Sequence, residues 1–276
     1  MNAKQRHKIR RITSEVLFWL LALVVIVPFL IVLFNAFKTK SEAVTMALTP
    51  PTTLHWENFA KVWEDGAILR SYGNSLYISI GSVLLSVMMS AMCAFVLSRN
   101  RSRFNKGLYL YFSLGLMFPL SMVTVVKVMR MLHLYGTLTG VVLLFAALLI
   151  PLSIFLFYGF VNGIPIELDE AAIVDGAGAL RLFFQIILPV MKPVTVTVVM
   201  INFLNAWNDF TVPLYLVPDP DKAVVVQQVY NFYGTYTAQW NLVCVTILYA
   251  IAPILVVYII GQKYIISGMV AGAVKG

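Results

Sequence analysis

The sequence predicts an all-α membrane protein with six transmembrane helices, and three observations lead to this prediction. Hydrophobic residues make up 60% of the 276 residues, whereas charged residues make up only 12%. Soluble domains carry about 25% charged residues, so much of the surface of this chain must face lipid. The charged residues also lie between long apolar runs, and six of these runs are long enough to cross a membrane.

The six predicted spans follow from the dimensions of a bilayer. A hydrocarbon core about 30 Å thick is crossed by a helix of about 20 residues. Backbone groups in lipid must bond within their own segment, which makes these runs helices. We predict spans at Val16–Phe37, Ser71–Leu97, Gly107–Val126, Thr137–Val161, Pro193–Pro218 and Asn241–Gln262. Asp209, in the fifth run, is the one Asp, Glu, Lys or Arg within them.

The distribution of basic residues predicts the orientation of the chain. Six spans place both termini and the second and fourth loops on one side, and this side carries 13 of the 20 Lys and Arg residues. The side richer in Lys and Arg is the cytoplasmic side, so we expect cytoplasmic N and C termini. The first apolar run could also be a signal peptide, but about 22 residues exceed a typical signal core and no small-residue cleavage site follows. We therefore expect a retained first helix.

These spans divide the chain into two parts. Residues 1–70 hold the cytoplasmic N-terminus, the first helix and the first external loop. Residues 71–276 form a five-helix core with a cytoplasmic loop at 161–192 and a cytoplasmic tail at 263–276. Cys93 and Cys244 fall within apolar runs and are interpreted as small core residues.

The loop at 161–192 is acidic and divides into two short helices. Pro165 suits a first helical position, the acids that follow favour a helix N-terminus, and Gly176 is placed to end the helix in a left-handed conformation. A second helix can run from about Ala179 until Pro189 interrupts it. Its predicted apolar face consists of Leu180, Phe183, Phe184, Ile187 and Leu188. On physical grounds the loop fits either a docking segment for another protein, with Glu170 able to bind an Arg, or an ordinary interfacial turn.

Two sets of polar residues lie within predicted spans. Asn202, Asn205 and Asp209 share one stripe of the fifth span, which fits either a face lining a water-filled path or hydrogen bonding between helices. Serines at alternating four- and three-residue steps mark the second span, where small side chains let helices approach closely. We interpret this stripe as a packing surface rather than a substrate site. Its members are Ser75, Ser79, Ser82, Ser86 and Ser90.

Several stretches resemble one transporter family. The EAA signature of permeases of ABC importers reads Glu-Ala-Ala, three residues, Gly, nine residues, then Ile-x-Leu-Pro. It is matched here by Glu170, Ala171, Ala172, Gly176, Ile186, Leu188 and Pro189. The context IPIELDEAAIVDGA resembles the maltose-type, carbohydrate branch, as do Trp207-Asn208-Asp209-Phe210, where Asp replaces the usual Glu, and the tail after Val270. The resemblance covers nearly the whole chain and is to the shorter of the two permease subunits.

The resemblance implies a permease fold and a set of partners. These are a second, longer permease subunit, two copies of a cytoplasmic ATPase subunit, and an extracellular or periplasmic sugar-binding protein. The ATPase would contact Glu170, Ala171, Ala172, Asp175, Gly176, Ile186, Leu188 and Pro189. The tail residues Ala271, Gly272, Ala273, Val274, Lys275 and Gly276 would reach between the ATPases.

The resemblance also implies which subunits bind cofactors and where in the cell this chain lies. This chain would bind no cofactor or metal, because ATP and Mg would be held by the ATPase subunits. It would lie in the bacterial cell (inner) membrane as a multi-pass protein surrounded by lipid, and it would carry sugar inward by alternating access.

Other classes of function fit the sequence less well. The chain has no G-x-x-x-x-G-K-[ST] loop for ATP and no cluster of His and acids within a span, so we do not expect an enzyme. Its formal charge of +8 comes from basic residues at the ends of spans, which argues against nucleic acid. An ABC importer of another solute, such as glycerol phosphate or a peptide, stays an alternative. A secondary transporter would need several buried ionisable groups or paired broken helices, whereas Asp209 stands alone.

Overall fold

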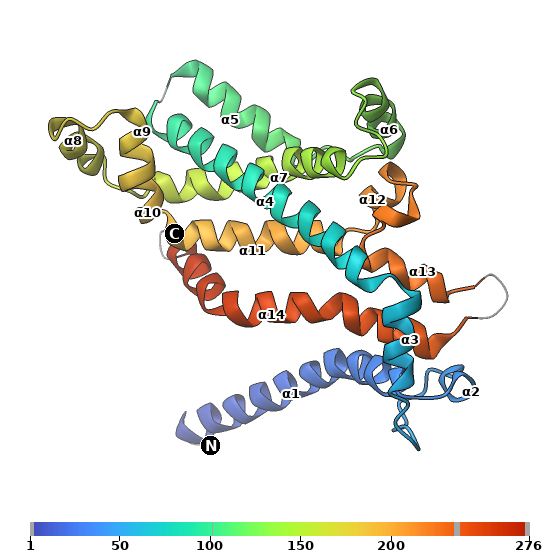
Figure 1. Ribbon diagram of the computed structural model, residues 1–276. Coiled ribbons are helices and arrows are strands. Elements are labelled where there is room, and N and C mark those ends of the chain that lie inside the picture. The colour runs from blue at the N-terminus through green and yellow to red at the C-terminus, as the bar shows by residue number, and fades with distance from the viewer. Residues whose placement is uncertain (1–2, 101, 235–237, 274–276) are drawn as a thin grey trace. The chain divides into compact units, whose positions relative to one another are not determined.

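The structure is a computed structural model that describes residues 3–100, 102–234 and 238–273, with side chains described over 11–100, 102–234 and 238–262. Within these residues the chain is built from helices and contains no strand (Figure 1). One isolated bridge joins Tyr233 to Ala238. The prediction of an all-α fold is therefore confirmed for the described part of the chain.

The chain divides into two compact units, residues 1–68 with 226–251 and residues 69–225 with 252–276. The first unit thus includes residues 226–251, which were predicted to belong to the five-helix core. Its helices are α1 (Ala3–Ala36), α2 (Lys40–Ala43), α3 (Glu57–Asp65), α13 (Val229–Phe232) and the beginning of α14 (Trp240–Ala273).

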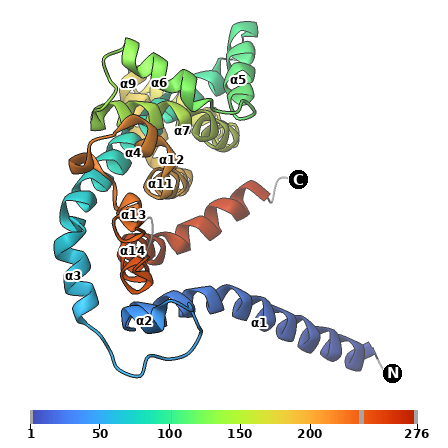
Figure 2. The same ribbon diagram turned by 90° about the vertical axis from the view of Figure 1, so that its right-hand side faces the viewer.

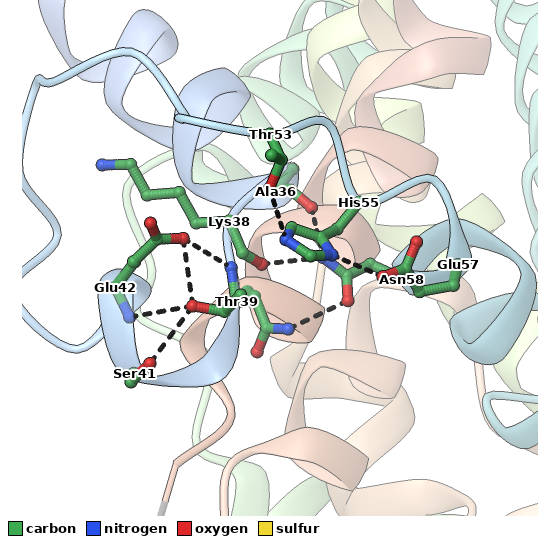
Figure 3. Close-up of polar contacts among 10 residues, drawn as sticks. Ala36, Lys38, Thr39, Ser41, Glu42, Thr53, His55, Glu57 and Asn58 are labelled. Carbon is green, nitrogen blue, oxygen red and sulfur yellow. Dashed lines mark hydrogen bonds and ion pairs between the residues drawn. The ribbon is translucent and has the colours of Figure 1, made fainter.

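Polar side chains tie together the segment between α1 and α3 in this unit (Figure 3). Thr39 caps α2 in a capping box, in which its hydroxyl accepts from the Glu42 backbone N–H and the Glu42 carboxylate accepts from the Thr39 backbone N–H. The Asn58 amide donates to the carbonyls of Ala36 and Lys38, both at 2.9 Å. Asn58 also accepts from Asn241 at 3.0 Å, which joins α3 to the start of α14.

In the described part of the chain, the second unit contains the rest of α14 and nine further α-helices. They are α4 (Ile68–Arg99), α5 (Arg103–Gly115), α6 (Met122–Met131), α7 (Leu138–Val161), α8 (Glu167–Val174), α9 (Ala179–Arg181), α10 (Leu188–Val190), α11 (Lys192–Asn208) and α12 (Thr211–Leu216). A short 3₁₀ helix at Pro220–Lys222 follows, and a second one, Val225–Gln228, lies at the boundary with the first unit. The central helix α7 packs against both α5 and α11 (Figure 2).

Among the described residues, four helices are long and apolar enough to cross a membrane. They cover Arg11–Ala36, Ile68–Arg99, Leu138–Val161 and Trp240–Gln262. A fifth span would be the bent pair of Ala179–Val190 and Lys192–Asn208, whose axes differ by 79°. These helices make the chain a multi-pass membrane protein, whereas the number six and the cytoplasmic position of the termini stay predictions.

The prediction of one continuous third span at Gly107–Val126 is wrong. Helix α5 ends at Gly115 and α6 begins only at Met122. The intervening residues include Pro119, which has no backbone N–H to donate and whose ring clashes with a preceding helical carbonyl. A run of apolar residues therefore contains a helix break that its mean hydropathy does not reveal.

The serine stripe of α4 packs inside the second unit, as predicted. All five of its serines are at most 2% exposed. The Ser82 hydroxyl donates to the Ile78 carbonyl and lies 3.2 Å from the Val142 carbonyl of α7, and the Ser90 hydroxyl donates to the Ile150 carbonyl of α7 at 3.4 Å. Small hydroxyl side chains let α4 and α7 approach closely, and those of Ser82 and Ser90 also find carbonyl acceptors on α7.

Candidate functional site

The acidic loop at 161–192 folds into two helical segments, as the sequence predicts. Its first helix, α8, carries Glu167, Asp169 and Glu170 in its first turn. Acids at this end interact favourably with the helix dipole and with unpaired backbone N–H groups. The helix begins two residues after Pro165, with Ile166 at the N-cap, so Pro165 precedes the helix instead of occupying its first position.

Gly176 ends α8 in the left-handed conformation that was predicted, with φ of +78°. The Gly176 N–H donates to the Ile173 carbonyl at 3.0 Å, and the Ala177 N–H donates to the Ala172 carbonyl at 2.9 Å. This pair of bonds is the Schellman motif, which satisfies carbonyls that the end of a helix would leave unpaired. A residue with a side chain would be strained at this φ.

The Glu-Ala-Ala segment has one buried and two exposed members. Glu170 and Ala171 are exposed, whereas Ala172 is only 5% exposed. Beyond them Ile173 is 61% and Val174 is 86% exposed, and Asp175 and Gly176 are exposed as well. The far end of α8 therefore presents a carboxylate next to unpartnered apolar side chains. Such a surface suits contact with another protein better than contact with water.

Asp169, the neighbour of Glu170, is buried and paired with the guanidinium group of Arg99 at the end of α4. Arg99 Nε lies 2.7 Å from Asp169 Oδ2, and Arg99 Nη2 lies 3.1 Å from Asp169 Oδ1. The side chains are 17% and 9% exposed, respectively. This is a bidentate, charge-assisted pair, the geometry in which Arg binds a carboxylate most strongly.

This pairing was not predicted from the sequence, where Arg99 is one of the 13 basic residues that indicate the orientation and Asp169 is one of the acids that follow Pro165. The one available signal was a basic residue at the last position of a long apolar helix, beside loops that contain acids. Its partner could not be chosen from the sequence, because the two residues are 70 positions apart.

The second helical segment of the loop differs from the predicted α-helix. After α9, residues Leu182–Ile187 form a π-helix, and α10 continues through Pro189 to Val190 before the chain bends at Met191. The prediction that Pro189 interrupts the helix is therefore wrong by two residues. The hydrogen bonds here span five residues, as from the Leu188 N–H to the Phe183 carbonyl. The helix therefore reaches Pro189 without a hydrogen bond donated by that residue.

The π-helix also changes which apolar residues are buried. Leu182, Phe183 and Ile187 are buried, whereas the predicted face members Leu180 and Phe184 are 69% and 43% exposed. The predicted face was counted at the spacing of an α-helix. The five-residue hydrogen bonds of a π-helix change which positions lie on the same face. Of the signature residues in this segment, Ile186 and Leu188 are partly buried and Pro189 is exposed.

The polar stripe predicted for the fifth span separates into different environments. Asn202 is 1% exposed, and its amide donates to Ser86 Oγ of α4 at 3.0 Å and to Ser153 Oγ of α7 at 2.9 Å. The alternative of hydrogen bonding between helices therefore describes Asn202. The prediction that the stripe is continuous is wrong, because α11 ends at Asn208.

Asp209 lies outside the helix and caps the next one. Its backbone is extended, and its carboxylate accepts from the Val212 N–H of α12 at 2.7 Å. Asn205 is exposed, and its amide donates to the Ile201 carbonyl of its own helix. Asn205 and Asp209 line an open hollow of about 350 Å³ together with Leu204 and Asn208.

The predicted contact segment at the C-terminus is described only in part. Ala271, Gly272 and Ala273 are the last residues of α14, and their side chains are not described. Val274, Lys275 and Gly276 lie outside the described residues.

A family model decides what this chain is. The model described as "Binding-protein-dependent transport system inner membrane component" matches residues 83–270. This match covers more than half of the chain and contains Arg99 and all of α8. The chain belongs to this family. It is therefore a transport permease by descent, and α1, α2 and α3 lie outside the matched region.

Several curated permeases are similar to this permease over nearly their whole length. The probable starch degradation products transport system permease protein AmyC of Thermoanaerobacterium thermosulfurigenes is 32% identical, over 92% of this chain and 93% of its own. The diacetylchitobiose uptake system permease protein NgcG of Streptomyces coelicolor is 32% identical, over 95% and 88%. The melibiose/raffinose/stachyose import permease protein MelC of Bacillus subtilis is 32% identical, over 91% of each chain.

The fold of this permease is also similar to a solved structure. A chain from the crystal structure of a bacterial ABC transporter involved in the import of the acidic polysaccharide alginate matches with a TM-score of 0.84. The match covers 96% of this permease and 98% of that chain, at 21% identity. The likeness confirms a permease fold for the helices described above.

Proposed function

We propose that this permease is the membrane-spanning subunit of an ATP-driven, binding-protein-dependent importer of sugars, with oligosaccharides as the substrate class. Its family consists of components of binding-protein-dependent transport systems. Relatives that are 32% identical are named for starch degradation products, diacetylchitobiose, and melibiose, raffinose and stachyose. Oligosaccharides are common to these names, which supports the substrate class without selecting one sugar.

The proposed assembly contains one longer permease, two copies of an ATPase subunit and an external sugar-binding protein. ATP and Mg are bound by the ATPases, and the two permeases together enclose the path of the sugar. This chain lies in the bacterial inner membrane with α8 and both termini on the cytoplasmic side. The tail from Ala271 to Gly276 reaches the ATPases.

The proposal for coupling rests on the exposed end of α8. We call α8 the coupling helix. It offers the carboxylate of Glu170, the small side chain of Ala171 and the apolar side chains of Ile173 and Val174. Small residues allow close approach by the ATPase, and Glu170 binds an Arg of that subunit through a bidentate contact. Movement of the ATPases on binding ATP is thereby transmitted to the permease, which alternates between inward- and outward-facing states.

The polar residues of α11 take separate roles in this proposal. Asn202 holds α4, α7 and α11 together, since both of its donated bonds cross between helices. Asn205 and Asp209 line the sugar path, because they border the hollow at the end of α11 and their polar groups can bind hydroxyls.

The substitution Glu170→Lys tests the coupling role in the whole transporter. It places a positive charge where an Arg is expected to bind, so ATPase association weakens and uptake of the sugar falls by at least about tenfold, equivalent to ~1.4 kcal/mol. The matched control is Glu15→Lys, which reverses an exposed acid of α1 whose ion pair with Arg11 lies on the surface and contributes little. Full uptake by Glu170→Lys would refute the docking role. A ligand screen of the copurified binding protein identifies the sugar.

A further inference from the structure

The guanidinium group of Arg99 contacts three elements of the second unit at once. It belongs to the last residue of α4 and binds both carboxylate oxygens of Asp169 in α8. Its Nη1 atom lies 3.2 Å from the Ile164 carbonyl and 3.5 Å from the Val161 carbonyl, at the end of α7. Its carbon Cζ lies 5.9 Å from the ring centroid of Phe95, one turn earlier in α4.

Each of these contacts suits the charge of the guanidinium group. The Val161 carbonyl ends α7, at the negative end of the helix dipole, and the Ile164 carbonyl follows in the next turn, so a cation there is favourable. The carboxylate of Asp169 neutralises that cation in a setting where solvent is largely excluded, since the side chain of Asp169 is 9% exposed. A second bond strengthens the link, because the buried Ser98 hydroxyl donates to Asn162 Oδ1 at 2.7 Å.

The coupling helix needs such an anchor. It has eight residues, about 12 Å of length, which is too short for a helix to be stable by itself in water. A force applied at Glu170 would unwind or swing a helix that was held only by its flanking turns. The guanidinium group of Arg99 binds α8 at Asp169, the residue next to Glu170.

We infer that Arg99 and Asp169 are positioning residues for energy coupling, which clamp the coupling helix to the cytoplasmic ends of α4 and α7. This inference rests on the proposed function. The clamp makes α8 and these two helix ends move as one body when the ATPase moves α8. Without the clamp, α8 still docks on the ATPase through Glu170, but its movement is no longer transmitted to α4 and α7.

Three variants test the clamp in the complete transporter reconstituted in liposomes. Arg99→Lys retains the charge but loses the bidentate fork. Asp169→Asn retains the shape of the side chain but loses its charge. The double variant Arg99→Met/Asp169→Leu replaces the ion pair by an apolar pair, an exchange that is often neutral for stability. Arg103→Gln, at an exposed position of α5, is the matched control.

The double variant separates coupling from folding. We expect it to assemble with the ATPases in normal amount, while the sugar imported per ATP hydrolysed falls by roughly 10-fold, within the ~5- to ~150-fold range of coupling between sites. Arg99→Lys and Asp169→Asn should also lower this ratio. If a well-assembled double variant imports sugar at the normal ratio, the pair is merely structural and the inference fails. Glu170→Lys tests docking independently, so the two failures can be distinguished.

A measurement on the unmodified clamp covers the case in which the variants do not fold. Spin labels are placed at Glu167 in α8 and at Met92 in α4, both exposed, after replacement of Cys93 and Cys244 by Ala. We expect the distance between the labels to be the same with and without ATP, because a clamped helix moves with α4. A distance that changes between the two states would refute the clamp whatever the variants do.

Discussion

The carboxylates of Asp169 and Glu170 are consecutive in the sequence and occupy opposite environments. Asp169 is buried and paired with Arg99, whereas Glu170 is exposed at the surface of α8. Successive residues of a helix point about 100° apart, so one short helix can present one acid inward and the next outward. The inward acid anchors the helix, and the outward acid is available to a partner.

The two acids should therefore differ in their effect on stability. Asp169→Ala leaves the guanidinium of Arg99 without its carboxylate and should lower the free energy of unfolding by about 3 kcal/mol, the lower end for buried pairs. Glu170→Ala removes an exposed side chain and should change it by at most about 0.5 kcal/mol. Thermal unfolding of the purified protein in detergent measures both. Equal shifts for the two variants would contradict this difference.

Gly176 and Gly107 should respond with opposite sign to the same substitution. Gly176→Ala forces a side chain into a left-handed conformation and should destabilise the protein by about 1 kcal/mol, although the space around it is open. Gly107→Ala lies within α5, also with open space, and should stabilise it by about 0.5–1 kcal/mol. Unfolding midpoints of the two variants measure the effect. A stabilising Gly176→Ala would show that the turn does not need its positive φ.

Asn202 and Asn205 should separate stability from transport. Asn202→Leu removes two bonds between helices, worth about 0.6 kcal/mol each in membrane proteins, and should lower the unfolding midpoint. Asn205→Leu loses a bond within its own helix and should leave the midpoint nearly unchanged while it lowers sugar uptake through the proposed path. Uptake assays and thermal unfolding are read side by side. Normal uptake by Asn205→Leu would show that Asn205 does not line the sugar path.

The segment between α1 and α3 should loosen in acid. Hydrogen bonds from the Thr39 backbone N–H and from the side chains of Thr52 and Thr39 lower the pKa of Glu42 below its ordinary value of 4.5, and a hydrogen bond from His55 lowers the pKa of Glu57 likewise. A carboxyl group with a lowered folded-state pKa contributes stability above pH 4.5 that is lost as the pH falls through the folded value. The protection factors of the amides of residues 38–58, which compare exchange with that of an unstructured chain at the same pH, should therefore fall below about pH 4.5.

The variant Glu42→Gln is the control for this pH dependence. Its loop should already exchange faster at neutral pH, because Gln accepts the capping bond without a charge. Its protection factors should fall less on acidification, since one of the two titrating groups is gone. An unchanged acid response in this variant would show that Glu42 does not contribute.

Local features of the sequence were sufficient for much of the candidate site. Acids followed by Gly176 predicted a short helix with a left-handed end, and the structure shows both. The Ser steps in α4 predicted a packing surface, which is buried. These features depend on neighbouring residues along one helix, where spacing alone determines which groups can meet.

Other predictions failed because a local pattern does not specify its surroundings. The apolar run 107–126 has the composition of a span, yet the chain breaks between α5 and α6. The apolar face of the second loop helix was counted at α-helical spacing, whereas residues 182–187 form a π-helix, which buries the predicted Phe183 and Ile187 but adds Leu182 and exposes Phe184. In both cases the composition is compatible with more than one backbone conformation.

The sequence by itself determined that this protein lies in lipid, that it is helical and that it carries the family signature. Each of these follows from composition or from residues close together in the chain. Only the tertiary structure decided which carboxylate is buried with Arg99, and that Asn202 joins three helices while Asp209 leaves its helix to cap the next. These outcomes depend on groups 49 to 116 positions apart and on where a backbone run ends. A one-dimensional pattern carries no information about which distant donor will be nearest once the helices pack.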